Sequence, residues 1–197
     1  MTDTDLTTAA DAAHQGQLII YPTDTLYALG ATIHNTNAIH HLYTLKKRPT
    51  TQPLSIAVPN THTMNTLAHL TPTAQQIATR FLPGPRTLIL NKKPTIPDLI
   101  TAGQPTIAIR IPNDPTALQL LNLTGPLTAT SANIHGHPAP TTITAIKQQL
   151  HAPNLIGIDR GPRAQNASTI IDLTSTPPRI LRHGPITQDT LMEALHG

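Results

Sequence analysis

The segment Leu18-Ile19-Ile20-Tyr21-Pro22-Thr23-Asp24-Thr25-Leu26-Tyr27 joins a short apolar run directly to a polar turn. Residues 18–21 are typical of a buried strand, and Pro22 ends it because proline cannot donate a hydrogen bond to a ladder. Loops at strand ends bind ligands in open α/β sheets, so the turn around Thr25 is a candidate functional site. Asp24 alone is equally well explained as an ordinary turn residue.

The same alternation of apolar strands and helical segments continues along the chain. A capping residue followed by proline indicates the start of a helix at Thr71-Pro72 and again at Asp114-Pro115. Further strands are expected at 54–58, 87–90, 106–111, 127–130, 155–158, 169–173 and 179–181, and helices at 37–46, 72–81, 115–123, 140–150 and 187–195. Interleaved elements predict a layered α/β (α+β) protein with a mixed sheet. The segment 159–167 is expected to be a loop, because it contains glycine, proline and polar residues.

Length and composition exclude several classes of protein. The chain has 197 residues, which fits a single domain over 1–197 with an aliphatic core, since only 2% of residues are aromatic. The absence of cysteine excludes disulfides, thiolate zinc sites and a cysteine nucleophile. The N-terminus does not resemble a signal peptide, and no apolar run approaches the roughly 20 residues of a membrane helix. We therefore expect a cytoplasmic protein without membrane contact.

Cationic side chains stand at three positions where an anion could bind. Lys46-Lys47-Arg48-Pro49 ends a predicted helix, where basic residues are favoured by the helix dipole alone. A cationic loop leading into a strand is equally typical of a phosphate site. Arg110 lies in an apolar strand, so its charge needs a carboxylate or an anionic ligand. Arg182 follows a short strand, again as a cation at a strand end.

The turn Ser131-Ala132-Asn133 follows a buried strand and offers hydroxyl and amide donors. The alternative is a simple turn that satisfies its own backbone. No Gly-x-Ser-x-Gly elbow surrounds Ser131, and neither standard glycine-rich phosphate motif occurs in the chain. A nucleotide site would therefore combine cations with polar donors from several strand ends. His135 and His137 lack a third ligand nearby, so we predict no metal site built from protein ligands.

A series of these motifs resembles the YrdC/TsaC-type threonylcarbamoyl-adenylate synthases in order and spacing. The motifs are Tyr21-Pro-Thr-Asp-Thr-Leu-Tyr-Ala-Leu-Gly30, Lys46-x-Arg48-Pro49 with Pro53-Leu54-Ser55, Pro83-Gly84-Pro85 with Thr87-Leu88, Thr106-Ile-Ala-Ile-Arg110-Ile-Pro112, Ser131-Ala132-Asn133 with Pro138-x-Pro140-Thr141, Ser168-Thr169, and Arg179-Ile-Leu-Arg182-x-Gly184. The resemblance covers residues 10–190. It implies a YrdC-like twisted mixed β-sheet flanked by helices, with a deep basic cavity.

The resemblance also implies an activity. The expected enzyme is a nucleotidyltransferase, L-threonylcarbamoyladenylate synthase, which converts L-threonine, bicarbonate and ATP to threonylcarbamoyl-AMP and pyrophosphate for tRNA threonylcarbamoyladenosine modification. Mg²⁺ is expected to arrive with ATP, without dedicated protein ligands. A downstream threonylcarbamoyl transferase is an expected partner, and tRNA is a further candidate. The alternative is a non-catalytic module that binds double-stranded RNA or tRNA, which a net charge of only +3 and the lack of an aromatic platform disfavour.

Residue roles follow from the resemblance, position by position. L-threonine is expected to contact Thr25, Arg110, Ser131 and Ser168. ATP is expected to contact Lys46, Arg48, Gln52, Thr106, Asn133, Thr141 and Arg182. The catalytic set is Lys46, Arg48, Ser131 and Asn133. Lys47 is expected to face solvent. Ala28 replaces the glycine that is usual in the family and is expected to narrow the cavity floor slightly.

Overall fold

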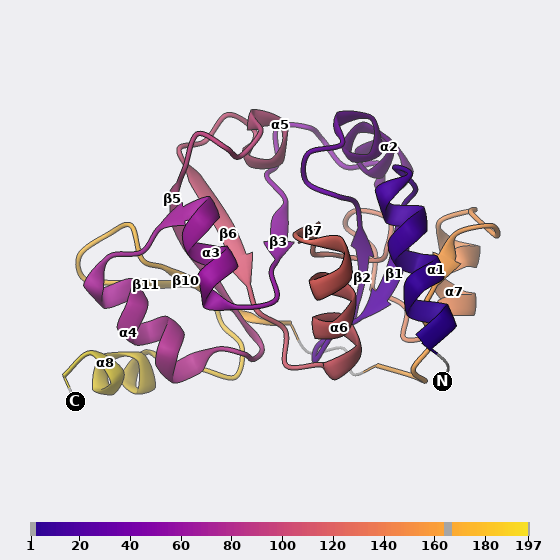
Figure 1. The fold of residues 1–197 in the computed structure, drawn as a ribbon. Helices are drawn as coiled ribbons and strands as arrows, with labels where there is room; N and C mark the ends of the chain where they lie inside the picture. The colour runs from indigo at the N-terminus through magenta and orange to yellow at the C-terminus, as the bar shows by residue number, and fades with distance from the viewer. Residues whose placement is uncertain (1–2, 164–166, 197) are drawn as a thin grey trace.

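The computed structural model describes residues 3–163 and 167–196, and its strands form two mixed sheets (Figure 1). The smaller sheet has the strand order β8-β2-β1-β9. Its strands are β1 (Ile19–Pro22), β2 (Tyr27–Gly30), β8 (Thr130–Ser131) and β9 (Ile156–Gly157). β2 runs antiparallel to both β1 and β8, whereas β9 runs parallel to β1.

The larger sheet has the strand order β11-β10-β5-β6-β3-β7, and a further strand, β4, pairs with β5. Its strands are β3 (Ser55–Ala57), β4 (Ala68–His69), β5 (Arg86–Lys92), β6 (Thr106–Arg110), β7 (Leu127–Thr128), β10 (Thr169–Asp172) and β11 (Arg179–Arg182). Parallel and antiparallel pairs alternate along it. The mixed α/β fold expected from the sequence is confirmed, but the strands form two sheets where one twisted sheet was expected.

The segment 127–131 joins the two sheets and was expected to be one continuous strand up to residue 130. It is instead divided: Thr128 pairs with Ile56 of the larger sheet, whereas Ser131 pairs with Ala28 of the smaller one. Between them the backbone N–H of Ala129 donates to Ser55 O at 2.8 Å. The chain changes sheets here because each half finds its ladder partner in a different sheet. Ser131 therefore lies at the junction between the sheets.

Helices surround the two sheets (Figure 1). They are α1 (Asp3–His14), α2 (Thr36–Lys46), α3 (Thr61–Leu67), α4 (Pro72–Phe81), α5 (Asp98–Thr101), α6 (Pro115–Thr124), α7 (Ile143–Gln149) and α8 (Gln188–His196). The two cap-plus-proline predictions are confirmed: Thr71 Oγ1 accepts from Ala74 N, and Asp114 Oδ1 accepts from Ala117 N. These starts were predictable because a cap is a local interaction.

Several elements differ from the expectation. The helix expected from residue 140 begins at Ile143, because the Thr142 hydroxyl caps it by accepting from Ala145 N. Helices α1, α3 and α5 and strands β2 and β4 were not predicted. In the expected loop 159–167, residues 159–163 and 167 have neither helix nor strand, and residues 164–166 lie outside the described residues.

Two buried clusters of apolar side chains form the core. The larger includes Leu29, Leu42, Ile56 and Ile109, so it extends across both sheets. In the smaller, α1 and α6 pack side by side over β1, which Figure 1 also shows. Alanines rather than large residues fill the α1 contact, which explains why no strong apolar stripe marked this helix in the sequence. Within the described part of the chain, no helix is long and apolar enough to cross a membrane.

Candidate active site

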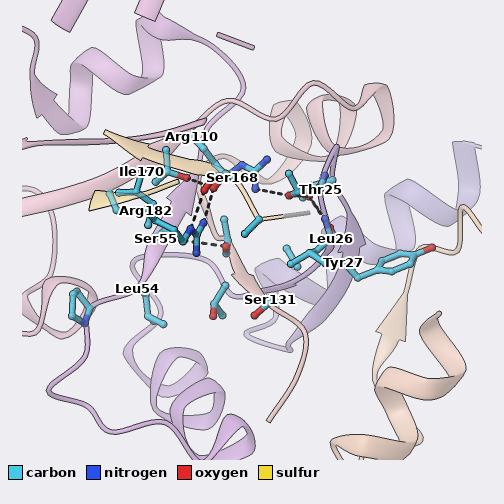
Figure 2. A pocket seen from close by; sticks show the side chains of 18 of the residues that line it. Thr25, Leu26, Tyr27, Leu54, Ser55, Arg110, Ser131, Ser168, Ile170 and Arg182 are labelled. Atoms are coloured by element: carbon cyan, nitrogen blue, oxygen red, sulfur yellow. Dashed lines mark hydrogen bonds between the residues drawn. The ribbon is translucent and has the colours of Figure 1, made fainter. Parts of the chain in front are cut away.

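A pocket of about 340 Å³ is lined by residues of both sheets (Figure 2). Its wall includes the turn between β1 and β2, the loop that follows Arg48, strands β5, β6, β10 and β11, and the junction at Ser131. Of the residues predicted for the site, the structure brings together in this wall Thr25, Arg48, Arg110, Ser131, Ser168 and Arg182. These residues are far apart in the sequence, and the meeting of the two sheets places them around one cavity.

Arg110 reaches the pocket because side chains alternate along β6. Ala108 and Arg110 face the pocket, whereas Ile107 and Ile109 lie in the core. The guanidinium forms an ion pair with Asp24 and donates from Nη1 to Thr25 Oγ1 at 3.0 Å. Figure 2 shows this contact with Thr25. The charge in an apolar strand is thus paired with a carboxylate, and Asp24 is more than an ordinary turn residue.

Arg182 and Ser168 meet in another part of the pocket wall (Figure 2). Arg182 donates from Nε to Ser168 O at 2.9 Å and from Nη2 to Ser168 Oγ at 2.8 Å. Ser168 Oγ also lies 2.9 Å from Thr87 Oγ1. Partial desolvation, together with the charge of Arg110, lowers the pKa of Arg182. Its guanidinium is therefore fixed by neutral oxygens rather than by a counter-charge.

Arg48 enters the pocket because the end of α2 turns sharply. Lys47 has a left-handed conformation with φ 50°, and its N–H donates back to the last turn of the helix. This turn leaves Lys47 exposed, as expected, and directs Arg48 to the pocket wall. Arg48 donates from Nη2 to Pro53 O at 2.9 Å and from Nε to Gln52 O at 3.4 Å. Partial burial lowers the pKa of Arg48.

Lys46 lies behind the pocket wall rather than on it, with only 1% of the residue exposed. Its ammonium donates to Ser131 O, to Asn133 O at 2.7 Å and to Asn133 Oδ1 at 3.2 Å. An ammonium has three N–H donors, so all are used within the protein. Burial, reinforced by Arg48, lowers the pKa of Lys46 to about 7. The Lys46 side chain is neither exposed to solvent at the helix end nor part of the cavity wall. It stabilises the 131–133 turn by hydrogen bonds.

The turn itself is closed by side chains. Ser131 Oγ donates to Asn133 Oδ1 at 2.6 Å, and Asn133 Nδ2 donates to His137 O. Ser131 lines the pocket, whereas Asn133 is buried beside Lys46. The interpretation of this segment as a turn whose polar groups bond to one another therefore applies to Asn133. Ser131 takes part in the same bonding but also lines the cavity.

Comparisons with known proteins assign this chain to a family. Residues 11–184 match the Sua5/YciO/YrdC family model, which carries the description "Telomere recombination". The chain belongs to this family. The threonylcarbamoyl-AMP synthase of Pyrococcus abyssi is 37% identical over 190 residues, which are 95% of this chain and 56% of that protein. The enzyme of the same name from Pseudomonas aeruginosa PAO1 is 32% identical over 171 residues, 85% of this chain and 91% of that protein.

A solved structure supports the same family assignment for the fold. The crystal structure of Pyrococcus abyssi Sua5 complexed with L-threonine has a TM-score of 0.92 and 34% identity, and the match covers 99% of this chain and 58% of that one. This Sua5/YciO/YrdC-family chain thus spans little more than half the length of the Pyrococcus protein. It spans about nine-tenths of the length of the Pseudomonas protein.

Besides Lys46 and Asn133, three further predicted ATP contacts of this Sua5/YciO/YrdC-family chain lie outside the pocket wall. Thr106 stands at the first position of β6, on the same face as Arg110 but at the far end of the strand. The Gln52 carbonyl accepts from Arg48 and from the Tyr43 hydroxyl, and the Thr141 carbonyl accepts from Arg163 N. The structure does not bring these three side chains to the wall, and their contacts with ATP stay predictions.

The sequence-based site missed several hydroxyl groups in the wall. Thr23, Ser55 and Thr87 all line the pocket. Thr87 and Ile89 alternate along β5 with the buried Leu88 and Leu90, so strand periodicity could have indicated Thr87. Ser55 Oγ donates to Ala129 O at 3.1 Å, a contact that no local pattern indicates. Ala28 lines the cavity, and its narrowing of the cavity floor stays a prediction.

Carboxylates are scarce around the pocket. Among residues 3–163 and 167–196, no group of three or more His, Cys, Asp or Glu side chains could hold a metal ion. Asp24 adjoins the wall, but its Oδ1 is bonded to Arg110. The donors that remain are hydroxyl and carbonyl oxygens, which suit a magnesium ion held mainly by nucleotide phosphates. Magnesium carried in with ATP stays a prediction.

Proposed function

We propose that the chain is an L-threonylcarbamoyladenylate synthase that forms threonylcarbamoyl-AMP and pyrophosphate from L-threonine, bicarbonate and ATP. The observation that carries the proposal is the joining of Arg48, Arg110 and Arg182 with polar hydroxyls around one cavity. The names of the Pyrococcus and Pseudomonas relatives support it. So does the Pyrococcus Sua5 complex with L-threonine, which is a precedent for this ligand in the family.

The proposed reaction has two steps. The threonine amine reacts with bicarbonate to give a carbamate and water. A carbamate oxygen then attacks the α-phosphorus of ATP as the bond to pyrophosphate breaks. Attacker and target are both anionic, so the barrier is dominated by electrostatic repulsion and by positioning. No covalent intermediate with the protein is needed.

The three arginines would bind different parts of the substrates. Arg48 and Arg182 are held by backbone and hydroxyl oxygens, so their charges are left to neutralise a triphosphate. Arg110 would pair with the threonine carboxylate, and Ser131 also lies on the pocket wall. Mg²⁺ brought by ATP would add further charge neutralisation at the phosphates. Lys46 would act by holding the 131–133 turn, and a direct contact with phosphate would require it to release one of its three oxygens.

The proposed product serves tRNA modification. Threonylcarbamoyl-AMP is a mixed anhydride, and its acyl group would be passed to an adenosine of tRNA by a separate threonylcarbamoyl transferase. The proposal therefore includes that transferase as a partner, tRNA as a further candidate ligand, and the cytoplasm as the compartment.

Pyrophosphate release tests the proposal directly. Release is expected only when ATP, L-threonine and bicarbonate are all present, so each is omitted in turn. Release that continues without threonine or without bicarbonate would overturn the synthase assignment. An RNA-binding module would show a different pattern, namely tRNA affinity that falls steeply with salt and no turnover.

A pair of neighbouring variants controls for the fold. Arg48→Ala removes a cation from the pocket wall, whereas Lys47→Gln removes one that faces solvent next to it. We expect Arg48→Ala to lose pyrophosphate release while its circular dichroism spectrum is unchanged. Lys47→Gln is expected to retain wild-type turnover. Unfolding of Arg48→Ala would instead indicate that the residue is structural.

A further inference from the structure

The ion pair between Asp24 and Arg110 is buried and incompletely bonded. Only 10% of the Asp24 side chain and 7% of the Arg110 side chain are exposed. Arg110 uses Nη2 for Asp24 Oδ1 and Nη1 for Thr25 Oγ1. Asp24 Oδ2 and Arg110 Nε are buried and have no hydrogen-bond partner. Unpaired buried polar atoms are costly, so such a pair is expected where function requires it.

The neighbouring hydroxyls have a fixed direction. Thr23 Oγ1 donates to Leu26 O at 2.6 Å, so in the 3.0 Å contact between Thr23 and Thr25 the proton comes from Thr25. Thr25 Oγ1 in turn accepts from Arg110. A hydroxyl has one proton and two lone pairs, so Thr25 has only one lone pair left for a ligand. Toward the cavity, Thr25 is therefore an acceptor and Arg110 a donor.

Asp24 does not line the pocket, although Thr23 and Thr25 on either side of it do. Its charge also acts on Arg86, whose Nε is likewise buried without a partner. Gly84 leaves the space for that guanidinium, because a Cβ at Gly84 would lie only 2.2 Å from Arg86 Nη1. The carboxylate, itself behind the wall, thus interacts with Arg110 on the wall and with Arg86 behind it. Any effect on a ligand passes through Arg110 and Thr25.

We propose that Asp24 is the positioning residue for the amino-acid end of the pocket. It holds the Arg110 guanidinium toward a substrate carboxylate and keeps Thr25 as an acceptor for an amino or hydroxyl hydrogen of the same substrate. By neutralising Arg110, it also makes this end suitable for a zwitterion rather than for a phosphate. The inference rests on the proposed function, because it takes L-threonine as the ligand.

Asp24→Asn tests this role because it removes the charge with almost no change in shape. The KM for L-threonine is expected to rise about tenfold or more, as for the loss of a charge-assisted hydrogen bond. The kcat and the KM for ATP are expected to change less than about twofold, since neither Arg48 nor Arg182 bonds to Asp24. If Asp24 had only a structural role, Asp24→Asn would lower the thermal midpoint and would not raise the KM for threonine more than the KM for ATP.

Asp114→Asn is the matched control. The Asp114 carboxylate is as buried as that of Asp24 and forms an ion pair with the partly exposed Arg163 at 3.2 Å, and neither residue lines the pocket. Asparagine retains the capping oxygen that Asp114 supplies to α6. We expect a similar fall in thermal midpoint for both variants and a threonine-selective KM change only for Asp24→Asn. Asp24→Glu keeps the negative charge but moves it by one methylene group. We therefore expect a smaller rise in the KM for threonine, again without a matching rise in the KM for ATP.

The outcomes separate this inference from the proposed function. A wild-type protein that neither binds threonine in calorimetry nor turns it over overturns the proposed function. Wild-type binding combined with an unchanged threonine KM in Asp24→Asn overturns the positioning role alone. An equal rise of both KM values does the same. If Asp24→Asn does not fold, Asp24→Glu decides by the same comparison of the two substrates.

Discussion

The three arginines of the pocket are held in two different ways. Arg110 is anchored by the carboxylate of Asp24, so this end of the cavity is close to neutral. Arg48 and Arg182 are anchored by carbonyl and hydroxyl oxygens, and the described residues form no ion pair with either of them. The three guanidinium groups thus differ in how far their charge is neutralised, although the sequence alone does not distinguish them.

The difference indicates which substrate each end is built for. A triphosphate carries several negative charges, which an uncompensated guanidinium attracts strongly in a partly desolvated site. A zwitterionic amino acid gains little from net charge and more from correctly directed donors and acceptors. The carbonyl-held arginines Arg48 and Arg182 suit the first ligand, and the Asp24–Arg110 pair suits the second.

The largest expected effect comes from deleting one arginine of each kind. Arg48→Ala should lower kcat/KM for ATP about 10²-fold or more, because it removes a preorganised charge from the developing transition state. Arg110→Ala should act mainly on the KM for threonine. Steady-state kinetics with each substrate varied in turn measures both. Similar losses for both substrates in both variants would show that the two ends do not act separately.

Lys46→Met tests whether the Lys46 ammonium stabilises the 131–133 turn, which forms part of the site with Arg48 and Arg182. Methionine fills a similar volume but removes the ammonium, which donates to three oxygens of the turn. Asn133 Oδ1 keeps the Ser131 hydroxyl and Ser131 O keeps Asn133 N, whereas Asn133 O loses its donor. Unfolding free energy at pH 7 should fall by about 3 kcal/mol, as for the loss of a charged donor that leaves one buried carbonyl unsatisfied. Urea denaturation measures this, with Lys47→Met as the exposed control. Equal stability of the two variants would mean that the ammonium contributes nothing to the turn.

The pH dependence of stability provides a further test of the cationic end. Burial and Arg48 lower the pKa of Lys46 from 10.5 to about 7, so between these values the unfolded state binds more protons than the folded state. Stability of the wild type relative to Lys46→Met should therefore rise with pH from about 7 toward 10, by at most about 1.4 kcal/mol per pH unit. Below pH 7 the difference should be constant. A flat difference across the whole range would show that the three oxygen partners keep the ammonium protonated.

Salt should have the smallest effect. It should change the KM for ATP, which depends on Arg48 and Arg182, more than the KM for threonine, which depends on Arg110. Raising the ionic strength screens an uncompensated charge more than a closed ion pair. The KM for ATP should therefore rise a few-fold between about 0.05 and 0.5 M salt, while the KM for threonine changes less. Equal dependence would indicate that Asp24 does not neutralise Arg110.

Parts of the site were readable from the residues because they depend on short-range patterns. The strand before Pro22, the capped starts of α4 and α6, and the alternation along β6 all follow from interactions a few residues apart. The family motifs added the identity of the wall residues. Neither could reveal that Asp24 pairs with Arg110, because 86 residues separate them.

The sequence by itself determined the mixed α/β class, most strand positions and the cations available to a phosphate site. Tertiary structure decided how those cations are used. The division of 127–131 between two sheets placed Ser131 at the cavity, and the left-handed turn at Lys47 directed Arg48 inward while Lys46 stayed behind the wall. The reason is physical: charge and hydrogen-bond partners in a cavity come from segments far apart in the chain. Which guanidinium is neutralised is settled only when those segments meet.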